Sequence, residues 1–388
     1  MMKYAIVTTV SSTMGSFGIP LAKELKNQGN EPVVICNMTE AFFYEYRDSF
    51  RCINLDIARG FHMVNLIKTI FKLYKIFKSE KFDIVQYGTE NAAFCGAIAS
   101  WMAKVPIRVY EHWGARYVGY AGFMRMVSKM IEKTAAFFST DVRQVSFRNM
   151  EMCVRDHIYS EKKVRVLGKG GTVGVDFQQF DLSHKQEFRL QVLEQYDIPS
   201  DAKIFGFVGR IQTDKGVNEL IDAFYKLYEQ DKMVYLLMVG AVDDANPIDA
   251  KKLEWAQQCQ NVIFTGFVSD AYRYMSAFDI MVHPTYREGF GMVLQEAAAL
   301  KIPIITTNIN GPGEYILHGE TGILVSAKDE EQLYHAMREL LVDVTQREIL
   351  AEKNYQYTKD YFERSIMVQR IIEDRKQLLY DRGGTQCH

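Results

Sequence analysis

The chain alternates between two kinds of hydrophobic segment. Short runs rich in β-branched residues are separated by longer segments, such as residues 63–79, in which apolar positions recur with a helical period. Strands joined by crossover helices form parallel sheets, so this alternation predicts an α/β protein. The expected strands are 4–10, 32–36, 84–86, 108–111 and 164–167 in a first series, and 204–208, 234–239, 262–265, 280–283, 304–306 and 323–324 in a second.

Two domains and a terminal helix are expected from the interruptions of this pattern. A polar stretch, DLSHKQEF at 181–188, and the turn-forming residues Pro199, Ser200 and Asp201 separate the two series. A length of 388 residues also suits two domains of about 100 to 200 residues each. The sequence therefore predicts domains at 1–185 and 200–360, followed by a helix within 361–388.

Composition and charge exclude several classes of protein. Hydrophobic residues make up 48% and charged residues 24% of the chain, which excludes a mainly disordered or collagen-like protein. The formal net charge of −2 excludes binding to nucleic acid driven by overall charge, and no nucleic-acid partner is expected. The charge is unevenly placed, however, because residues 51–150 hold 15 basic and 7 acidic side chains. An acidic partner is therefore expected at the first domain.

The cysteines and the apolar segments indicate a cytoplasmic protein. The six cysteines are far apart, and no C-x-x-C spacing of a zinc or redox site occurs. The apolar N-terminal stretch is too short for a signal peptide, and no run of about 18 apolar residues is present elsewhere.

The first motif that indicates chemistry follows a predicted strand at 204–208. There the sequence GRIQTDKG places Arg210 and Lys215 in a loop between Gly209 and Gly216. Ligands of open parallel sheets bind beyond the carboxyl ends of the strands, so these cations are positioned to neutralise a diphosphate. Two solvated loop charges are the alternative.

The second motif, EGFGMVLQE, lies between a strand that ends at His283 and a helix that begins near Gly291. Its glycines let a ligand approach the backbone, and the free N–H groups of a first helical turn bind anionic oxygens. Glu288 would face a reacting sugar, and Glu296 would accept the hydroxyls of a ribose. The alternative makes Glu288 a partner of the helix dipole and Glu296 an exposed helix residue.

Together, the two motifs resemble glycosyltransferase family 4. The combination of G-R-x(4)-K-G and, about 70 residues later, E-G-F-G-x(4)-E is much rarer than either motif alone. The resemblance is strongest over residues 200–330. It implies a retaining nucleotide-sugar transferase of the GT-B fold, with two Rossmann-like domains facing across a cleft. It further implies that 1–185 binds the acceptor, that 200–360 binds the nucleotide sugar, and that the helix in 361–388 returns to the N-terminal domain.

The resemblance assigns roles to individual residues of the second domain. Arg210 and Lys215 would hold the donor diphosphate, Glu288 would contact the transferred sugar as a catalytic residue, and Glu296 would bind the ribose. The remaining donor contacts are Gly289, Phe290 and Gly291 at the sugar, Gly291, Met292 and Val293 at the diphosphate, and Gly240, Phe267 and Val268 at the nucleobase.

The resemblance also extends to two positions in the first domain. Gly15, in SSTMGSFG, would lie in a flexible loop beneath the diphosphate, although the paired glycines of the family are not adjacent here. His112, in EHWG, corresponds by position to a histidine near the donor sugar and is the second catalytic candidate; a structural histidine is the alternative. No D-x-D pair lies in a suitable loop, since Asp243 and Asp244 are adjacent. The nucleotide sugar is therefore expected to act without a metal or another cofactor.

Two basic helical segments of the first domain are expected to contact an anionic membrane. In one, lysines alternate with Ile67, Phe71 and other apolar residues, and in the other, basic residues lie near Phe123 and Met124. Basic amphipathic helices bind anionic lipid surfaces. The alternative is a pair of ordinary helices with solvated cations. The basic residues concerned are Lys68, Lys72, Lys75, Lys78 and Lys81 in the first segment and Arg125, Lys129 and Lys133 in the second.

The resulting hypothesis is a retaining glycosyltransferase of surface-polysaccharide synthesis. It would move a sugar from a UDP-sugar, or another nucleoside-diphosphate sugar, to a polyprenyl-diphosphate-linked glycan of a capsule, O-antigen or exopolysaccharide. It would act in the cytoplasm or on the cytoplasmic face of the inner membrane. Two alternatives remain open: a nucleotide-sugar 2-epimerase of GT-B shape, and a non-catalytic subunit that binds glycans or nucleotide sugars. An oxidoreductase is disfavoured because no G-x-G-x-x-G opens a helix after the first strand.

Overall fold

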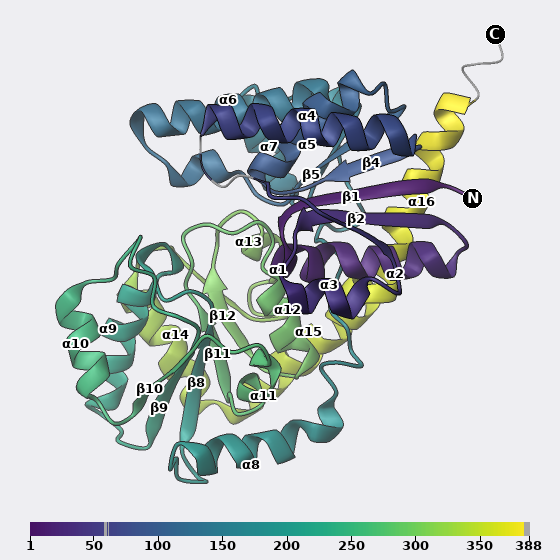
Figure 1. Cartoon of the computed structure of the whole chain (residues 1–388). Helices are drawn as coiled ribbons and strands as arrows, with labels where there is room; N and C mark the ends of the chain where they lie inside the picture. The colour runs from purple at the N-terminus through teal and green to yellow at the C-terminus, as the bar shows by residue number, and fades with distance from the viewer. Residues whose placement is uncertain (58–59, 61, 384–388) are drawn as a thin grey trace. The chain divides into compact units, whose positions relative to one another are not determined.

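The computed structural model describes residues 1–57, 60 and 62–383. The chain forms two compact units, each containing one parallel sheet (Figure 1). The first unit comprises Met1–Val173 and the C-terminal segment from Arg364, and the second comprises Gly174–Glu363. The chain therefore passes twice from one unit to the other.

The first unit contains a seven-stranded parallel sheet in the order β3-β2-β1-β4-β5-β6-β7. Its register places Ala5 opposite Val33 on one side and Val85 on the other. Two of its strands were not expected from the sequence, because β3 is largely exposed and β6 carries the polar residues Arg143 and Gln144. The strands are β1 Lys3–Val10, β2 Glu31–Asn37, β3 Arg51–Asn54, β4 Ile84–Tyr87, β5 Ile107–His112, β6 Asp141–Gln144 and β7 Val164–Val166.

Helices cover both faces of this sheet (Figure 1). One face carries α4 Met63–Glu80, α5 Glu90–Met102, α6 Gly122–Phe138 and α7 Phe147–Arg155. The small residues of α5 let it pack closely between α4 and α6. The other face carries α2 Ile19–Asn27, α3 Glu40–Tyr46 and α16 Arg364–Gly383. Residues between β1 and α2 continue the helix as α1 Ser11–Thr13 and the π-helical turn Met14–Gly18.

Buried ion pairs attach α16 to the first unit. The fully buried Arg375 donates hydrogen bonds from Nε to Tyr4 Oη at 3.1 Å and from Nη2 to Gln86 Oε1 at 3.1 Å. Arg375 also pairs with Glu111 at the end of β5. Beside it, Arg143 of β6 binds Asp374 with both arms of its guanidinium, at 2.8 and 2.9 Å. The last helix of the chain is therefore an integral part of the N-terminal unit.

The second unit contains a six-stranded parallel sheet in the order β10-β9-β8-β11-β12-β13. All six strands lie where the hydrophobic pattern predicts them, to within one residue at each end. They are β8 Lys203–Val208, β9 Val234–Val239, β10 Val262–Gly266, β11 Ile280–His283, β12 Ile304–Thr307 and β13 Ile323–Val325. The helices are α8 Lys185–Gln195, α9 Val217–Tyr228, α10 Ala250–Gln258, α11 Ala271–Met275, α12 Met292–Ala299, α13 Pro312–Tyr315, α14 Glu330–Val342 and α15 Val344–Phe362.

The second unit begins earlier than the sequence indicates. Residues 174–200 belong to it, although the polar composition of 181–188 suggested a linker. Helix α8 is fixed to the second unit by Arg189, which donates a hydrogen bond to the carbonyl of Ala277 at 2.6 Å and pairs with Asp279 at 3.2 Å. Lys185 donates to the carbonyl of Leu300 at 2.7 Å. A polar segment can therefore pack on a domain through its side-chain hydrogen bonds.

Among the described residues, no helix is both long enough and apolar enough to cross a membrane.

Candidate functional site

The predicted donor-site residues of the second unit lie at the carboxyl edge of its sheet. Neighbouring strands in the order β10, β9, β8 and β11 end at Gly266, Val239, Val208 and His283. These strand ends are followed by Phe267 and Val268, by Gly240, by Arg210 and Lys215, and by Glu288. With a strand spacing of about 4.8 Å, the row from β10 to β11 measures about 14 Å. The edge therefore presents the predicted base, diphosphate and sugar contacts in the order in which a nucleotide sugar carries these groups.

Lys215 and Glu288 form the most closely defined contact of this edge. Lys215 Nζ donates a hydrogen bond to Glu288 Oε2 at 2.6 Å, and His283 Nε2 lies 3.7 Å from the same oxygen. The backbone N–H of Gly289 donates to Glu288 Oε1 at 3.1 Å. Burial disfavours the carboxylate, but Lys215 and His283 outweigh burial and hold the pKa of Glu288 well below its ordinary value. Glu288 is therefore an anion at neutral pH.

His283 contributes to this cluster as a neutral imidazole. Its side chain is almost completely buried at the end of β11. Burial lowers the pKa of His283, as does the nearby charge of Lys215, while Glu288 acts in the opposite direction. From the sequence, His283 was expected only to end a strand. His283 is the last residue of the strand that leads into the EGFG loop, and this position was the signal that could have identified it.

Two glycines let the loops of this edge pack against one another. Gly216 has φ = +70°, and a side chain there would place its Cβ 1.9 Å from the carbonyl oxygen of Pro284. Gly240 has φ = +145°, and its Cβ would lie 1.9 Å from the carbonyl oxygen of Gly209. Only glycine fits such positions without moving the backbone. Gly216 thus brings the Lys215 loop onto the strand that leads to Glu288.

Arg210 lies at the same edge and remains accessible. Its side chain is 64% exposed, and Nη1 donates to Asp243 Oδ2 at 2.8 Å. Asp243 follows β9 and therefore orients the guanidinium from the neighbouring strand end. This pairing was not expected from the sequence, in which Asp243 stands beside Asp244 without the D-x-D spacing of a metal site.

The EGFG loop leads into α12, whose N-cap is Gly291 with φ = +91°. Met292 and Val293 form the first turn, where backbone N–H groups lack partners within the helix. Glu296 lies further along the same helix and is partly buried. Phe290 contributes only its backbone here, because its ring is buried against Tyr315 and Phe362. The expected sugar contact of Phe290 is through its backbone amide, and it stays a prediction.

The nucleobase position has one distinctive side chain. Phe267 is 82% exposed directly after β10, and Val268 beside it is partly buried. An exposed aromatic ring at the edge of a sheet suits stacking against a planar base. The assignment of Gly240, Phe267 and Val268 to the base stays a prediction.

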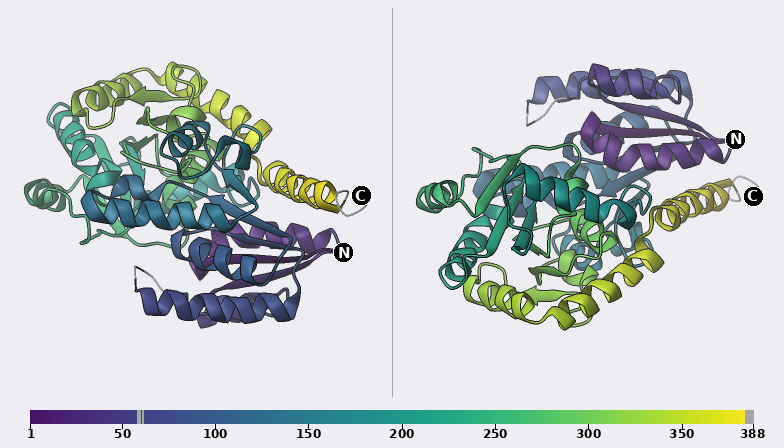
Figure 2. Two further views of the ribbon diagram at one scale, coloured as in Figure 1. Left: turned by 90° about the horizontal axis from the view of Figure 1, so that it is seen from above. Right: turned by 90° about the horizontal axis from the view of Figure 1, so that it is seen from below.

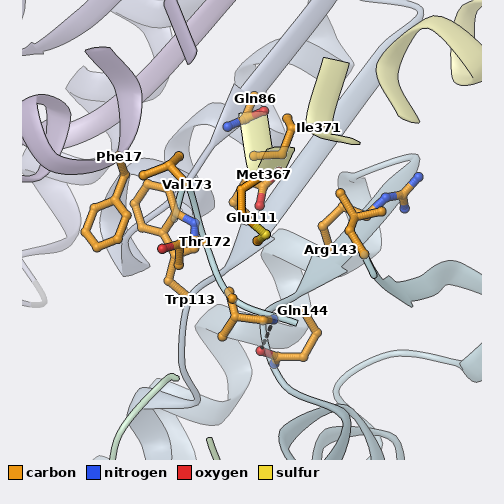
Figure 3. Close-up of a pocket in the computed structure, with 13 residues that line it drawn as sticks. Phe17, Gln86, Glu111, Trp113, Arg143, Gln144, Thr172, Val173, Met367 and Ile371 are labelled. Atoms are coloured by element: carbon orange, nitrogen blue, oxygen red, sulfur yellow. Dashed lines mark hydrogen bonds between the residues drawn. The ribbon is translucent and has the colours of Figure 1, made fainter. Parts of the chain in front are cut away.

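The first unit contains a pocket at the carboxyl edge of its own sheet (Figure 3). Phe17, Trp113, Thr172 and Val173 lie together on one side of it, and Arg143 lies on the other. The rings of Phe17 and Trp113 stack with centroids 4.6 Å apart and planes inclined by 24°. The other lining residues are Gln86, Glu111, Gln144, Val145, Leu167, Gly171, Met367 and Ile371.

His112 does not line this pocket. Successive side chains of a strand point to opposite faces, so Glu111 and Trp113 lie at the pocket while His112 is buried on the other side of β5. Its Nε2 lies 3.2 Å from Glu132 Oε2, and its Nδ1 lies 3.2 Å from Tyr159 Oη and 3.1 Å from Gln144 Nε2. The structure therefore places His112 in a buried polar cluster, and its role beside the donor sugar stays a prediction.

The buried pair of His112 and Glu132 predicts a pH dependence of stability. Burial alone would lower the pKa of His112, but the charge of Glu132 raises it to about 10. Because folding raises the pKa of His112, its ion pair makes its full contribution to the free energy of unfolding below about pH 6.5. That contribution is lost as the pH rises toward 10. We expect the thermal midpoint of the wild type to fall more between pH 7 and 10 than that of His112→Gln. An imidazole signal that titrates near pH 6.5 in nuclear magnetic resonance would contradict this interpretation.

Gly15 also differs from its expectation. It lies in the π-helical turn Met14–Gly18 and not in a flexible loop. A Cβ at Gly15 would lie 3.8 Å from the Phe42 ring, which is an ordinary contact. Gly18 is the constrained glycine of this turn, because its Cβ would lie 2.2 Å from the sulfur of Met14. The diphosphate contact of Gly15 stays a prediction, without a conformational reason for a glycine.

Comparison with known proteins identifies the family of this chain. The model for glycosyl transferases group 1 matches residues 189–357, and the model for glycosyl transferase 4-like proteins matches residues 7–144. The capsular polysaccharide biosynthesis glycosyltransferase CapM of Staphylococcus aureus is 31% identical over 331 residues, which are 85% of this chain and 86% of CapM. The chain belongs to glycosyltransferase family 4. The resemblance stated from the two motifs is thereby confirmed.

Two further relatives extend over nearly the whole glycosyltransferase. The N,N'-diacetylbacillosaminyl-diphospho-undecaprenol alpha-1,3-N-acetylgalactosaminyltransferase of Campylobacter jejuni is 26% identical and covers 98% of this chain and 99% of its own. The crystal structure of Anabaena HepE in complex with UDP and glucose has a TM-score of 0.81 at 19% identity, covering 97% of this chain and 100% of HepE. The expected GT-B fold is confirmed by such structural neighbours.

A bound metal ion would require several ligand side chains close together in the described part of the glycosyltransferase. No group of three or more His, Cys, Asp or Glu side chains is placed there to hold a metal ion. Arg210 and Lys215 contribute positive charge at this edge, and the first turn of α12 contributes backbone N–H groups.

Proposed function

We propose that this glycosyltransferase moves a sugar from a nucleoside-diphosphate sugar, UDP-sugars being the first to test, to a lipid-linked glycan with retention of anomeric configuration. The observation that carries the proposal is the cluster of Lys215, Glu288 and His283 at the carboxyl edge of the second sheet. It lies beside the free N–H groups of α12 and in line with the exposed ring of Phe267.

The chemistry that this edge supports is departure of a diphosphate. The bond between the anomeric carbon and the diphosphate oxygen breaks, and the acceptor hydroxyl oxygen forms the new bond to that carbon while its proton passes to the departing diphosphate. Arg210 and Lys215 neutralise the charge that develops on the diphosphate, and the first turn of α12 donates hydrogen bonds to it. Glu288, ionised at neutral pH, orients the sugar and offsets the positive charge at its anomeric carbon.

The acceptor class is supported by what the relatives are named for. CapM is a glycosyltransferase of capsular polysaccharide biosynthesis, and the Campylobacter jejuni relative is named for an undecaprenol-diphosphate-linked acceptor. These relatives support transfer to a polyprenyl-diphosphate-linked glycan in surface-polysaccharide synthesis. We assign acceptor binding to the first unit and donor binding to the second.

Ligand-dependent stabilisation tests the donor. We expect one or more nucleotide sugars, from a panel of UDP- and GDP-sugars, to raise the midpoint of thermal unfolding. A donor at 100 times its Kd adds about 2.7 kcal/mol to the free energy of unfolding of the form that binds it. The stabilising donor is then incubated with polyprenyl-diphosphate-linked sugars, and the product is identified by mass spectrometry. Formation of an epimer without transfer would support the 2-epimerase, and binding without any turnover would support the non-catalytic subunit.

We further propose that α4 and α6 of the first unit rest on an anionic membrane. Helix α4 is the outermost helix of this unit in both views of Figure 2, and its Ile67 and Phe71 are 46% and 53% exposed. The buried side of α4 packs on the core through Leu66, Leu73 and Phe77. Helix α6 exposes Phe123 and Phe137 by 70% and 74%. The lysines of α4 and the basic residues of α6, of which Arg125 and Lys133 are exposed, lie on the same two helices as these apolar side chains.

Vesicle binding tests this membrane contact. We expect the protein to sediment with phosphatidylglycerol vesicles and not with phosphatidylcholine vesicles, and we expect salt to weaken the binding. Replacing Lys68, Lys72 and Lys75 by Gln should weaken it about 100-fold, at about 1 kcal/mol for each lysine. The matched control replaces three exposed lysines of the second unit, Lys251, Lys353 and Lys359. Equal losses in the two triple variants would contradict the proposed contact.

A further inference from the structure

We propose that the ion pair of Asp214 and Arg287 positions the two charged side chains that directly follow it in the chain. These side chains are Lys215, in the 3₁₀ turn Thr213–Lys215, and Glu288, in the loop after β11. The role of the pair rests on the proposed function, because that function assigns the chemistry to Lys215 and Glu288. It goes beyond that function by naming what holds these two groups in alignment.

The Asp214–Arg287 pair joins the two loops through one carboxylate oxygen. Arg287 Nε donates a hydrogen bond to Asp214 Oδ2 at 2.7 Å, and Arg287 Nη2 lies 2.6 Å from the same oxygen. The aspartate side chain is only 15% exposed. Two charge-assisted N–H contacts to a largely buried carboxylate fix the orientation of a guanidinium more closely than one contact to an exposed carboxylate. The pair therefore restrains the two loops relative to each other.

Backbone contacts at the same positions reinforce the ion pair. The N–H of Tyr286 donates a hydrogen bond to the carbonyl oxygen of Asp214 at 2.9 Å. The hydroxyl oxygen of Thr285, which is fully buried, lies 3.3 Å from the carbonyl oxygen of Asp214 and 3.0 Å from that of Arg287. These four residues therefore form one hydrogen-bonded unit, and the next residue of each loop extends from it.

The order of the charges favours a single alignment of the two loops. The first loop carries an acid followed by a base, and the second carries a base followed by an acid. In the structure each charge meets its opposite, with the closest atoms 2.6 Å apart in both ion pairs. An exchange of partners would place Lys215 beside Arg287 and Asp214 beside Glu288, and like charges at such distances repel. The charges therefore oppose any alignment that separates Lys215 from Glu288.

The variant Asp214→Asn distinguishes positioning from a direct effect of charge. Removing a negative charge from this edge would by itself make the edge more positive and favour departure of the diphosphate. We expect the opposite result, a kcat about 10- to 100-fold lower, because a displacement of Lys215 by about 1 Å misaligns it with the leaving group. Transfer is measured with the donor and the polyprenyl-diphosphate-linked acceptor found for the wild type. A kcat equal to or above that of the wild type would overturn the proposal.

A double variant shows whether the two residues act as one pair. Arg287→Gln should lower kcat by about the same factor as Asp214→Asn, since either change removes the whole pair. The double variant should then be no slower than the slower single variant, because neither residue retains a partner to lose. Losses that multiply in the double variant would mean that the residues act independently, and this result would overturn the proposal.

Titration of Glu288 tests the positioning without requiring transfer. Lys215 and His283 hold the pKa of Glu288 well below its ordinary value, so displacement of Lys215 should raise this pKa. In nuclear magnetic resonance, the carboxyl carbon signal that disappears in Glu288→Gln reports it. We expect this signal to titrate at a higher pH in Asp214→Asn than in the wild type, although loss of a neighbouring negative charge alone would lower the pKa. Titration at the same or a lower pH would overturn the proposal.

The matched control is Arg189→Gln. Arg189 pairs with Asp279 at 3.2 Å, directly before β11 and therefore at the other end of the strand that leads to Glu288. This variant should lower the thermal midpoint and leave kcat and the Glu288 titration unchanged. Equal losses of kcat in Arg189→Gln and Arg287→Gln would indicate reduced stability and overturn the positioning role. Absence of donor protection and transfer in the wild type would overturn the proposed function instead, and the Glu288 titration would still decide the role of the pair.

Discussion

Replacing Lys215 by Ala is expected to lower kcat about 100- to 1000-fold while the fold is kept, which is the usual effect of removing one donor that stabilises transition-state charge. Lys215 is the cation nearest to Glu288, at 2.6 Å, and lies in the loop after β8 where we place the diphosphate. The substitution removes positive charge from the leaving group and also leaves Glu288 without its ion-pair partner. Kinetics with a fixed donor and acceptor, together with circular dichroism for folding, measure the effect.

The pH dependence of the Lys215 variant tests the same contact by a second measurement. The lowered pKa of Glu288 means that its stabilising ion pair is present above the ordinary carboxyl range and is lost only as the pH falls through the lowered pKa. In Lys215→Ala the pKa of Glu288 should rise, so its carboxylate should protonate at a higher pH than in the wild type. Lys251→Ala, an exposed substitution on α10, is the matched control. Wild-type kcat in Lys215→Ala would remove Lys215 from the proposed mechanism.

Replacing Arg375 by Met is expected to lower the free energy of unfolding of the first unit by about 3 to 5 kcal/mol, because it leaves a buried carboxylate without its partner. Arg375 is fully buried, and its guanidinium bonds Tyr4 and Gln86 besides Glu111. Urea unfolding in a Trp255→Phe background measures the loss, since both remaining tryptophans, Trp101 and Trp113, belong to the first unit.

Two further variants show whether the lost charge pair is the cause. Arg382→Met removes an arginine of the same helix whose side chain is 40% exposed, and it should cost about 0 to 1 kcal/mol. The double variant Arg375→Met with Glu111→Gln removes both charges, and it should recover part of the loss because no unpaired carboxylate remains. If the double variant instead loses the sum of the free energies of unfolding lost in the two single variants, the cause is lost packing and not lost pairing.

The strand ends and loops at which we propose that the donor binds could be predicted from the sequence because their signals are local. Each of these loops directly follows a strand with a clear hydrophobic run, and parallel strands bring their carboxyl ends to one edge. Gly216 and Gly291 lie where the chain needs a positive φ, so the glycines of both motifs could be recognised without the fold. The inward packing of the Phe290 ring against Phe362 could not be predicted from the motif, because it depends on contact with a distant segment.

The sites of the first unit depend on contacts between residues that are distant in the chain. Glu111 and Arg375 are 264 residues apart, and no local pattern relates them. His112 and Trp113 are adjacent in EHWG, and only the pairing of β5 decides which of them lies at the pocket. The sequence by itself determined the α/β class, the family and the loops that we propose as donor contacts, because strand periodicity and loop motifs are properties of short segments. The return of the last helix to the first unit was implied by the family resemblance. Only the tertiary structure decided which buried charges hold α16 there, that His112 is buried against Glu132 and that Trp113 lines the pocket, because side-chain orientation and the pairing of buried charges depend on which distant segments pack together.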